Sequence, residues 1–355
     1  MRPRRVLWVS TRTDTRGGVA TYVRTLQGTP LWERWRIRHV ATHRNGSRTA
    51  RVGTFAMGVG GVVRELAVRR PGLVHLHTSC YGSFARKSAL AWMFRAAGIP
   101  VVMHVHGGAF GDFYARSPRL LQRYIRRTLS SAERVIGLGD RWAAALQRIA
   151  PDARVIVVPN AVSPRTLVDQ PGPGEPVHVL FVGEMTEDKG AFALLEAWRQ
   201  LREEPHLPCA DLVMVGPGDL ERAWRETEEL GPAGQVRVLG WVESAEVERL
   251  LSHSHVLVLP SRFEGQPMAV LEAMAHGLCV VATEVGGIPD LVDDECAVLV
   301  PVDDGNALVA ALRTVISDPG KRSELGALAL ARVRARFDVA LAWRTLDALY
   351  EELVR

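Results

Sequence analysis

Short apolar runs recur along the first half of the chain, and each ends at a glycine, a proline or a polar loop. Runs of roughly four to eight apolar residues between such turn signals are typical of fully buried strands. They cover residues 5–10, 73–77, 101–106, 135–138 and 155–158. Segments with helical spacing of apolar residues lie at 19–26, 86–97 and 115–132. Strand, helix and strand in succession predict a parallel sheet.

The second half repeats this alternation. Its apolar runs cover 177–182, 211–215, 236–239, 256–259, 279–282 and 298–300. Its helical segments cover 191–201, 245–252, 268–275, 306–317, 321–336 and 339–354. We therefore predict an α/β protein of two Rossmann-like domains, the first at 1–165 and the second at 177–336, with a proline- and glycine-rich linker at 166–176 and a last helix at 337–355.

The stretch that follows the apolar run 256–259 combines a turn with a helix start. Pro267 stands at a position typical of a first helical residue, and Gly277 follows the helix-forming residues 268–275. The unpaired N–H groups of a first helical turn, together with the positive end of the helix dipole, form a site for an anion. The residues that can offer such N–H groups are Gln266, Met268 and Ala269.

Two glutamates flank this helix start. Glu264 lies in the turn before it, and Glu272 lies about two helical turns further along the same side. A carboxylate there can accept hydrogen bonds from a diol such as a ribose. A sugar joined to a nucleotide through a diphosphate would use both glutamates and the anion site. Glutamates are also common near helix starts because they suit the dipole, so the pair alone is a weak indication.

The whole block is more specific. Glu-Gly-Gln-Pro-Met-Ala-Val-Leu-Glu-Ala-Met-Ala-His-Gly at 264–277, followed by Val-Gly-Gly-Ile-Pro-Asp at 285–290, closely resembles the nucleotide-sugar block of the retaining family 4 glycosyltransferases. The resemblance covers nearly the whole chain. It implies the GT-B fold, in which two Rossmann-like domains face each other across a cleft, with an acceptor-binding first domain to which the helix at 337–355 returns.

The resemblance also implies an activity and roles for single residues. A hexosyl group would pass from a nucleotide diphosphate sugar to an acceptor hydroxyl with retention at the anomeric carbon, without a metal or another cofactor. His106 would orient the sugar, Glu264 would hold its hydroxyls and Glu272 the ribose. The residues that would hold the donor's phosphates are Lys189, which precedes Gly190 as in the family, the loop residues Gly17 and Gly18, and the backbone at Gly265, Gln266, Met268 and Ala269.

Simpler interpretations remain open for several of these residues. Adjacent glycines such as Gly17 and Gly18 often form only a turn, and a histidine at the end of a strand, such as His106, can be structural. Glu184 departs from the family, which has arginine there, and it reverses a charge where a cation is expected. Either that one position is misaligned or its carboxylate turns away. Arg12 or Arg16 would then supply the missing charge.

Charge is distributed unevenly along the chain. Residues 1–170 hold 28 lysines and arginines against 8 acidic residues, and residues 171–355 hold 16 against 31. A half this basic indicates an anionic partner such as nucleic acid, lipid head groups or a phosphorylated acceptor. The resemblance favours a glycan or lipid-linked acceptor over nucleic acid.

The segment 115–132 carries arginines at helical spacing beside apolar residues. Such a helix suits an anionic membrane surface, and an arginine-faced surface helix packed on the sheet explains the pattern equally well. Family members that use lipid-linked acceptors dock on the membrane through their first domain, which favours the membrane slightly. The arginines are Arg119, Arg123, Arg126 and Arg127.

The remaining composition is that of a soluble globular protein, with 47% hydrophobic and 23% charged residues and no apolar run of the roughly 20 residues that span a bilayer. The four scattered cysteines predict reduced thiols and a cytoplasmic location, peripheral on the inner membrane face if the basic half binds lipid. The histidines at 75, 77, 104 and 106 alternate along two strands, but no acidic or thiol ligand stands at matching spacing, so we expect no metal.

A nucleotide-sugar epimerase of the same architecture and a non-catalytic nucleotide-sugar binding protein are the alternative functions.

Overall fold

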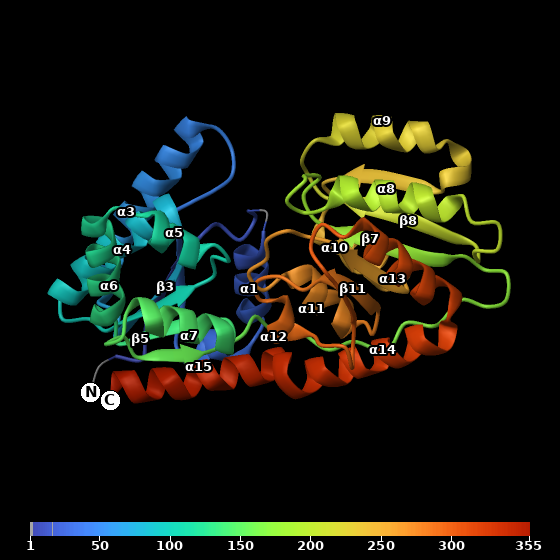
Figure 1. The fold of residues 1–355 in the computed structure, drawn as a ribbon. Coiled ribbons are helices and arrows are strands. Elements are labelled where there is room, and N and C mark those ends of the chain that lie inside the picture. Colours follow the sequence, from blue (N-terminus) through green and yellow to red (C-terminus); the bar gives the residue numbers. More distant parts are fainter. Residues whose placement is uncertain (1–2, 16) are drawn as a thin grey trace. The chain divides into compact units, whose positions relative to one another are not determined.

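The structure is a computed structural model that describes residues 3–15 and 17–355. The chain forms two compact units, shown in Figure 1. The first comprises residues 1–161 and 338–355, and the second comprises residues 162–337. Each unit has its own six-stranded sheet, in which all strands are parallel.

The first sheet has the strand order β2-β1-β3-β4-β5-β6. Its strands are β1 (Val6–Ser10), β2 (Arg38–Ala41), β3 (Leu73–Thr78), β4 (Val101–Val105), β5 (Arg134–Gly137) and β6 (Val155–Val157). The helices of this unit are α1 (Gly18–Gln27), α2 (Pro30–Arg34), α3 (Arg48–Arg69), α4 (Tyr81–Ala96), α5 (Phe110–Arg116), α6 (Arg119–Ser131), α7 (Asp140–Ile149) and α15 (Val339–Val354).

The second sheet has the order β12-β11-β10-β7-β8-β9. Its strands are β7 (Val177–Val182), β8 (Ala210–Val215), β9 (Val236–Gly240), β10 (Val256–Leu259), β11 (Cys279–Thr283) and β12 (Val298–Val300). Its α-helices are α8 (Ala191–Arg202), α9 (Leu220–Leu230), α10 (Ser244–Leu251), α11 (Met268–Ala275), α12 (Ile288–Leu291), α13 (Gly305–Ser317) and α14 (Pro319–Arg332). Short 3₁₀ and π turns cover Pro232–Gly234 and Val333–Phe337.

The strand order identifies the edge of each sheet where a ligand is expected. In the first sheet β1 lies between β2 and β3, and in the second β7 lies between β8 and β10. The direction in which the chain adds strands therefore reverses beside β1 and beside β7. In open parallel sheets, ligands bind outside the carboxyl ends of the strands at such a reversal. The loops that follow β1 and β3, and those that follow β7 and β10, are therefore the places to look for sites.

Several sequence-based assignments differ from the structure, and the helices α2, α7, α9 and α12 were not predicted. The predicted helix 115–132 is two helices, α5 and α6, which break at Ser117 and Pro118 because proline disfavours helical geometry in the residue before it. The pair β2 and α3 was not predicted, since the glycines of α3 lower its helix propensity. Gly58 shows why glycine is present: a Cβ there would lie 2.4 Å from the carbonyl oxygen of Ala41.

The boundary between the units also lies earlier than the predicted boundary after residue 165. The amide of Val162 donates to the carbonyl oxygen of Phe337 at 2.9 Å, and the amide of Arg165 donates to that of Ala275, also at 2.9 Å. Residues 162–165 therefore pack with the second unit.

All four cysteines are free thiols. Within the described residues, no helix combines the length and the apolar composition needed to cross a bilayer.

Helix α15 packs on the first sheet and closes part of its core. Leu346 and Tyr350 of this helix are fully buried, in one apolar cluster with Trp8 of β1. The indole N–H of Trp8 donates to the hydroxyl of Tyr350 at 3.0 Å, and that hydroxyl contacts Nδ1 of His75. The last helix of the chain thus completes the interior of the first unit.

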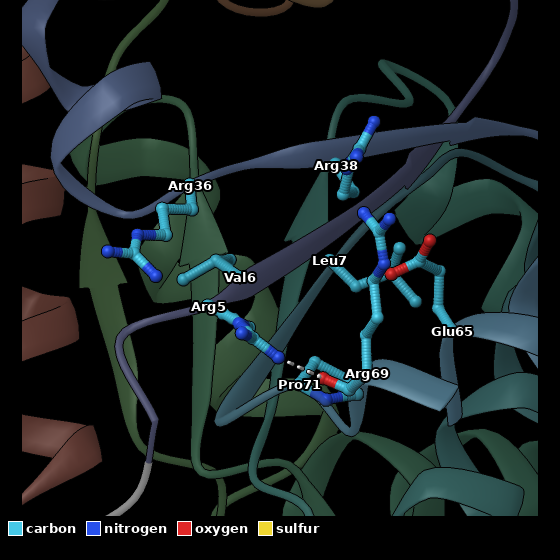
Figure 2. A pocket seen from close by; sticks show the side chains of 8 residues that line it. All are labelled: Arg5, Val6, Leu7, Arg36, Arg38, Glu65, Arg69 and Pro71. Atoms are coloured by element: carbon cyan, nitrogen blue, oxygen red, sulfur yellow. Dashed lines mark hydrogen bonds between the residues drawn. The ribbon is translucent and has the colours of Figure 1, made fainter. Parts of the chain in front are cut away.

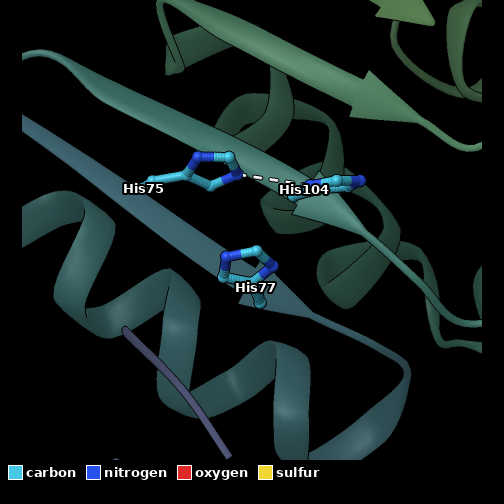
Figure 3. A group of neighbouring side chains, drawn as sticks. All are labelled: His75, His77 and His104. Atoms are coloured by element: carbon cyan, nitrogen blue, oxygen red, sulfur yellow. Dashed lines mark hydrogen bonds between the residues drawn. The ribbon is translucent and has the colours of Figure 1, made fainter. Parts of the chain in front are cut away.

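Four histidines form a ladder on one face of the first sheet. His75 and His77 lie on β3 and His104 on β4, as Figure 3 shows, and His106 follows β4. The rings of His75 and His77 stack 4.5 Å apart, and those of His104 and His106 stack 4.1 Å apart. Hydrogen bonds join the two strands, between His75 Nε2 and His104 Nδ1 at 3.2 Å and between His77 Nδ1 and His106 Nε2 at 2.9 Å.

Burial keeps this ladder uncharged. It lowers the pKa of His75 and of His106 to about 3, with the charge of His106 as a smaller cause at His75. Burial, with smaller contributions from the neighbouring histidines, also holds the pKa values of His77 and His104 well below the ordinary value. All four imidazoles are therefore neutral near pH 7.

Acid should destabilise this unit through the ladder. The unfolded chain binds protons at these histidines near pH 6.5 and the folded unit does not, so stability is full above that pH and falls as the pH decreases. At pH 5 we expect a loss of roughly 2 kcal/mol for each of His75 and His106. The melting temperature should then fall on the order of 10 °C between about pH 7 and about pH 5, measured by circular dichroism.

His106→Gln should flatten this dependence, because it removes one of the groups that binds a proton only on unfolding. His253→Gln, at an exposed position of the second unit, is the matched control and should leave the dependence as it is. A melting temperature that is constant over this pH range would contradict the neutral ladder.

Candidate functional site

The second sheet brings a lysine and a glutamate together at its reversal point. Lys189 lies in the loop after β7, and Glu264 lies in the loop after β10. Lys189 Nζ donates to Glu264 Oε1 at 2.6 Å, and Ser261 Oγ donates to the same oxygen at 2.8 Å. The Glu264 side chain is 8% exposed and that of Lys189 is 29% exposed. The site therefore holds a nearly buried carboxylate whose charge is compensated by a more accessible ammonium group.

Glycines allow the loops to approach this closely. Gly190 has a φ of +70°, and a Cβ there would lie 2.1 Å from the carbonyl oxygen of Pro260. Gly286 has a φ of +54°, and a Cβ there would lie 1.9 Å from the carbonyl oxygen of Glu264. The amide of Gly287 also donates to that oxygen at 3.3 Å. Two of the glycines in the family-like motifs are thus needed to position Glu264 and its partner.

The loop after β10 leads directly into α11. This helix begins at Met268, after Pro267, so its first amides have no acceptor within the helix. Gln266 is buried before the helix start, and Glu272 is partly buried further along the helix. The other predicted donor residues, Gly265 and Ala269, lie in the same loop and first turn. Lys189, Glu264 and the start of α11 therefore occupy neighbouring loops at one edge of one sheet.

Glu184 is exposed in the loop after β7. This loop lies against the loop after β8, where Gly218 has a φ of +134° and bridges to Met185. A cation that the sequence analysis missed comes from the loop after β10, because the Arg262 amide donates to the carbonyl oxygen of Asp188 at 2.8 Å. Its guanidinium pairs with Asp303 at 2.7 Å. Its position two residues before Glu264 is the only sequence signal that could have identified it.

The first unit places Gly17 at the end of the loop after β1. Gly17 caps α1 with a φ of +116°, which requires glycine, and nothing lies within 4 Å of the position where a Cβ would be. Gly18 is the first residue of α1. Arg12 in the same loop forms a two-point ion pair with Asp14, at 2.9 and 2.7 Å. Arg16 lies outside the described residues.

His106 follows β4 at the same carboxyl edge. The next residue, Gly107, packs so closely that a Cβ would lie 2.7 Å from Ser79 Oγ. His77 Nδ1 contacts His106 Nε2, and His77 Nε2 is buried without a hydrogen-bond partner in the described part of the chain. An orphaned N–H is rarer in protein interiors than an orphaned acceptor. We therefore assign the His77 proton to Nδ1, which leaves the His106 proton on Nδ1 of that ring.

The histidine ladder does not fit a metal well. His75, His77 and His104 each bring a nitrogen to within 4.8 Å of the others, which is close enough for ligands of one ion. However, both nitrogens of His75 already form hydrogen bonds, to Tyr350 and to His104. That no metal takes part stays a prediction.

Helix α6 has one buried face and a long exposed one. Ile125 and Leu129 are buried, whereas Leu120 is 83% exposed and Tyr124 is exposed beside it. The four predicted arginines share the exposed surface. They are Arg119, Arg123, Arg126 and Arg127.

A cavity of about 190 Å³ lies at the opposite edge of the first sheet, at the amino ends of β1 and β2. Figure 2 shows that four arginines and Glu65 line it. Arg5 also donates to the backbone carbonyl oxygen of Arg69 at 3.4 Å. None of the described residues that the sequence predicted for the site lines this cavity.

Two family profiles match the chain in succession. The one described as a glycosyl transferase 4-like domain matches residues 3–161, and the one described as glycosyl transferases group 1 matches residues 176–318. Each profile falls within one of the two units.

Curated relatives match over part of their length. The chain is 32% identical over 187 residues to the amylovoran biosynthesis glycosyltransferase AmsK of Erwinia amylovora, over 50% of this chain and 46% of that protein. It is 26% identical over 264 residues to the UDP-Gal:alpha-D-GlcNAc-diphosphoundecaprenol alpha-1,3-galactosyltransferase of Escherichia coli, over 69% of this chain and 66% of that protein. The match therefore spans about half to two thirds of the length of these relatives.

Solved structures match over nearly the whole chain. The sucrose-phosphate synthase of Thermosynechococcus elongatus superposes with a TM-score of 0.82 at 20% identity, over 98% of this chain and 99% of that one. HepE of Anabaena, in complex with UDP-glucose, superposes with a TM-score of 0.74 at 17% identity, also over 98% and 99%. These likenesses confirm the predicted α/β GT-B fold. With the two family profiles matched in order along it, the chain belongs to the group 1 glycosyltransferases of family 4.

Proposed function

We propose that this protein transfers a hexosyl group from a nucleotide diphosphate sugar to a hydroxyl group of a lipid-linked or polysaccharide precursor, with retention at the anomeric carbon. The observation that carries the proposal is the ion pair of Lys189 and Glu264 at the reversal point of the second sheet. A cation, a nearly buried carboxylate and a helix start lie there together, and a nucleotide diphosphate sugar needs all three.

The donor would bind by exchanging partners within this ion pair. The ammonium group of Lys189 and the first amides of α11 would hold the diphosphate, because charged hydrogen bonds to phosphate oxygens are the strongest available. Glu264 would then turn its acceptor oxygens to the sugar hydroxyls and keep its hydrogen bond from Ser261. Glu272 would accept hydrogen bonds from the ribose. Arg262 would supply the positive charge that the family takes from the position of Glu184.

The reaction would need no covalent intermediate on the protein. The bond from the anomeric carbon to the diphosphate oxygen breaks, and the acceptor oxygen bonds to that carbon on the same face. The acceptor proton passes to an oxygen of the departing diphosphate. Lys189 stabilises the negative charge that develops on this group. His106, with its proton on Nδ1, would orient the sugar.

The relatives support this assignment. AmsK is named for the biosynthesis of amylovoran, and the E. coli relative is named for the transfer of galactose from UDP-galactose to a diphosphoundecaprenol-linked sugar. HepE was solved in complex with UDP-glucose. The basic first half of this chain suits an acceptor that carries phosphate.

Donor binding should be visible as thermal stabilisation. A ligand at about 100 times its Kd stabilises the folded state by about 2.7 kcal/mol, so one of UDP-, GDP- and ADP-sugars should raise the melting temperature. Lys189→Ala should abolish this shift and lower kcat/KM roughly 100- to 1000-fold, as expected for loss of a group that stabilises developing charge. Lys321→Ala, at an exposed lysine of α14, is the matched control. Unchanged kinetics in Lys189→Ala would contradict the proposed site.

Transfer should depend on an acceptor, and its product should keep the donor's anomeric configuration. Proton NMR of the reaction mixture distinguishes the anomers and also detects epimers. Incubation with donor alone should give slow hydrolysis at most, and Glu264→Gln should slow transfer more than it weakens donor binding. An epimer formed without acceptor would identify an epimerase. Full function of Glu264→Gln in cells would favour a non-catalytic sugar-nucleotide binding protein.

The exposed face of α6 should bind anionic membranes. Each arginine near such a surface contributes about 1 kcal/mol, so Arg123→Gln with Arg127→Gln should weaken binding to phosphatidylglycerol vesicles roughly tenfold or more. Arg336→Gln with Arg344→Gln, at exposed positions outside α6, is the control. Vesicle flotation at low and high salt is the measurement. Binding that is equal for both double variants would make α6 an ordinary surface helix.

A further inference from the structure

A second pocket lies at the carboxyl edge of the first sheet, where β2 ends and α3 and α4 begin. Its volume is about 410 Å³, which is within the range of small-molecule sites. The residues that line it are Thr42, His43, Arg48, Arg51, Val52, Phe55 and Arg86. None of these lining residues is acidic. The cavity of Figure 2, in contrast, has the acidic residue Glu65 among the arginines that line it.

A buried lysine contacts one of the residues that line this pocket. Lys87 on α4 is 2% exposed, and its Nζ donates to Thr42 Oγ1 at 2.6 Å. Among the described residues, no carboxylate pairs with this ammonium group. A buried charge without a counter-ion is costly in the protein interior. The chain uses lysine at only three positions, and here it places one where it is almost completely removed from water.

A second buried donor is unsatisfied at the same place. Nε of Arg86 is buried and has no hydrogen-bond partner in the part of the chain that the structure describes. Arg48 and Arg51 lie in the first turn of α3, which contains no acidic residue. Cations at the positive end of a helix dipole are unfavourable unless an anion lies nearby. Donors and positive charge thus converge on the pocket without an acceptor.

The pKa values of these groups are lowered, as expected where positive charges lie close together. Burial, and next the charge of Arg86, lower the pKa of Lys87 to about 7. Burial, followed by the charge of Arg51, also lowers the pKa of Arg86. The pKa of His43 is lowered by burial and then by Arg86, Arg51 and Lys87 in that order. An anion in the pocket would offset each of these effects.

We propose that this pocket binds the phosphate or diphosphate group of the sugar acceptor, with Arg51, Arg86 and Lys87 as its principal cations. The proposal rests on the proposed function, since it assigns a part of the acceptor to the first unit. A diphosphate carries charges that two guanidinium groups can bind at two points each, while a buried ammonium acts as a point charge. The phosphate belongs to an acceptor that is either lipid-linked or water-soluble, and the experiment separates these two sources.

The first experiment measures anion binding alone. Inorganic pyrophosphate is titrated calorimetrically into the full chain after saturation with UDP, GDP or ADP, whichever nucleotide's sugar raises the melting temperature, so that the proposed donor site is filled. We expect Arg51→Gln, at an exposed position, to weaken binding tenfold or more, and Arg86→Gln to do the same. Lys321→Ala, at an exposed lysine of the second unit, should leave this binding unchanged. Equal affinity in the wild-type protein and in Arg51→Gln would overturn the proposal.

Binding of the anion should change the protonation of Lys87. The anion should return a proton to its ammonium group, so binding above about pH 7 should take up protons, as measured in buffers of different ionisation enthalpy. Lys87→Met, which keeps the length of the side chain, should remove this uptake. Uptake that persists in a folded Lys87→Met protein would exclude Lys87 from the site.

The second experiment identifies the source of the phosphate. Arg51→Gln should raise KM for a phosphate-bearing acceptor while leaving KM for the donor and transfer to an unphosphorylated acceptor unchanged. A rise confined to polyprenyl diphosphate sugars indicates the lipid-linked source, and a rise for sugar phosphates the soluble one. An unchanged acceptor KM with weakened pyrophosphate binding would overturn the assignment to the acceptor. Weakened pyrophosphate binding in a protein without transfer activity would refute the proposed function but keep the anion pocket.

Discussion

The ion pair between Lys189 and Glu264 is the interaction on which the site in the second unit depends. A carboxylate that is 8% exposed must be compensated, because an unpaired charge at that depth would be strongly destabilising. The free protein compensates it with a lysine from a different loop. Under the proposed function, a ligand with its own negative charge would take over the lysine.

The backbone around this pair is specialised for the contact. Gly190 and Gly286 have positive φ angles, and a side chain at either would collide with a backbone carbonyl oxygen of a neighbouring loop. The parallel sheet sets the distance between these loops, since β7 and β10 are adjacent strands whose carboxyl ends meet at one edge. Sheet order, glycine geometry and charge thus act together to place one cation beside one buried anion.

The first unit distributes charge in a different way. Its four stacked histidines are kept neutral by burial, so they add polarity and hydrogen bonds to the edge of the sheet without adding charge. The positive charge comes instead from arginines and from Lys87. Under the proposed function, a neutral ring such as His106 would contact a sugar while the cations of this unit would hold a phosphate.

Much of the fold could be predicted from local patterns. Helix α11 has the predicted bounds 268–275, because a proline, an apolar run and a glycine mark its start, body and end. The pair β2 and α3 could not be predicted in this way, since β2 is short and partly exposed and the glycines of α3 obscure its helical pattern. The prediction of a single helix at 115–132 was wrong. It followed the apolar spacing and gave too little weight to Pro118, where the helix breaks.

The candidate site could also be predicted only in part. Lys189 and Glu264 were identified from motifs, but their contact joins residues 75 positions apart and follows only from the order of the strands. The pairing of His77 with His106 depends on the register between β3 and β4, which no single segment encodes. The anion pocket joins side chains from three elements, and Arg262 became apparent only through its contact with the loop after β7.

A crystal structure of the protein with the nucleotide sugar that stabilises it would show directly whether the ion pair of Lys189 and Glu264 opens for the donor. We predict a diphosphate oxygen about 3 Å from Lys189 Nζ, with Glu264 released from the lysine and a ribose hydroxyl on Glu272. A nucleotide bound elsewhere, with Lys189 and Glu264 still paired to each other, would contradict this prediction.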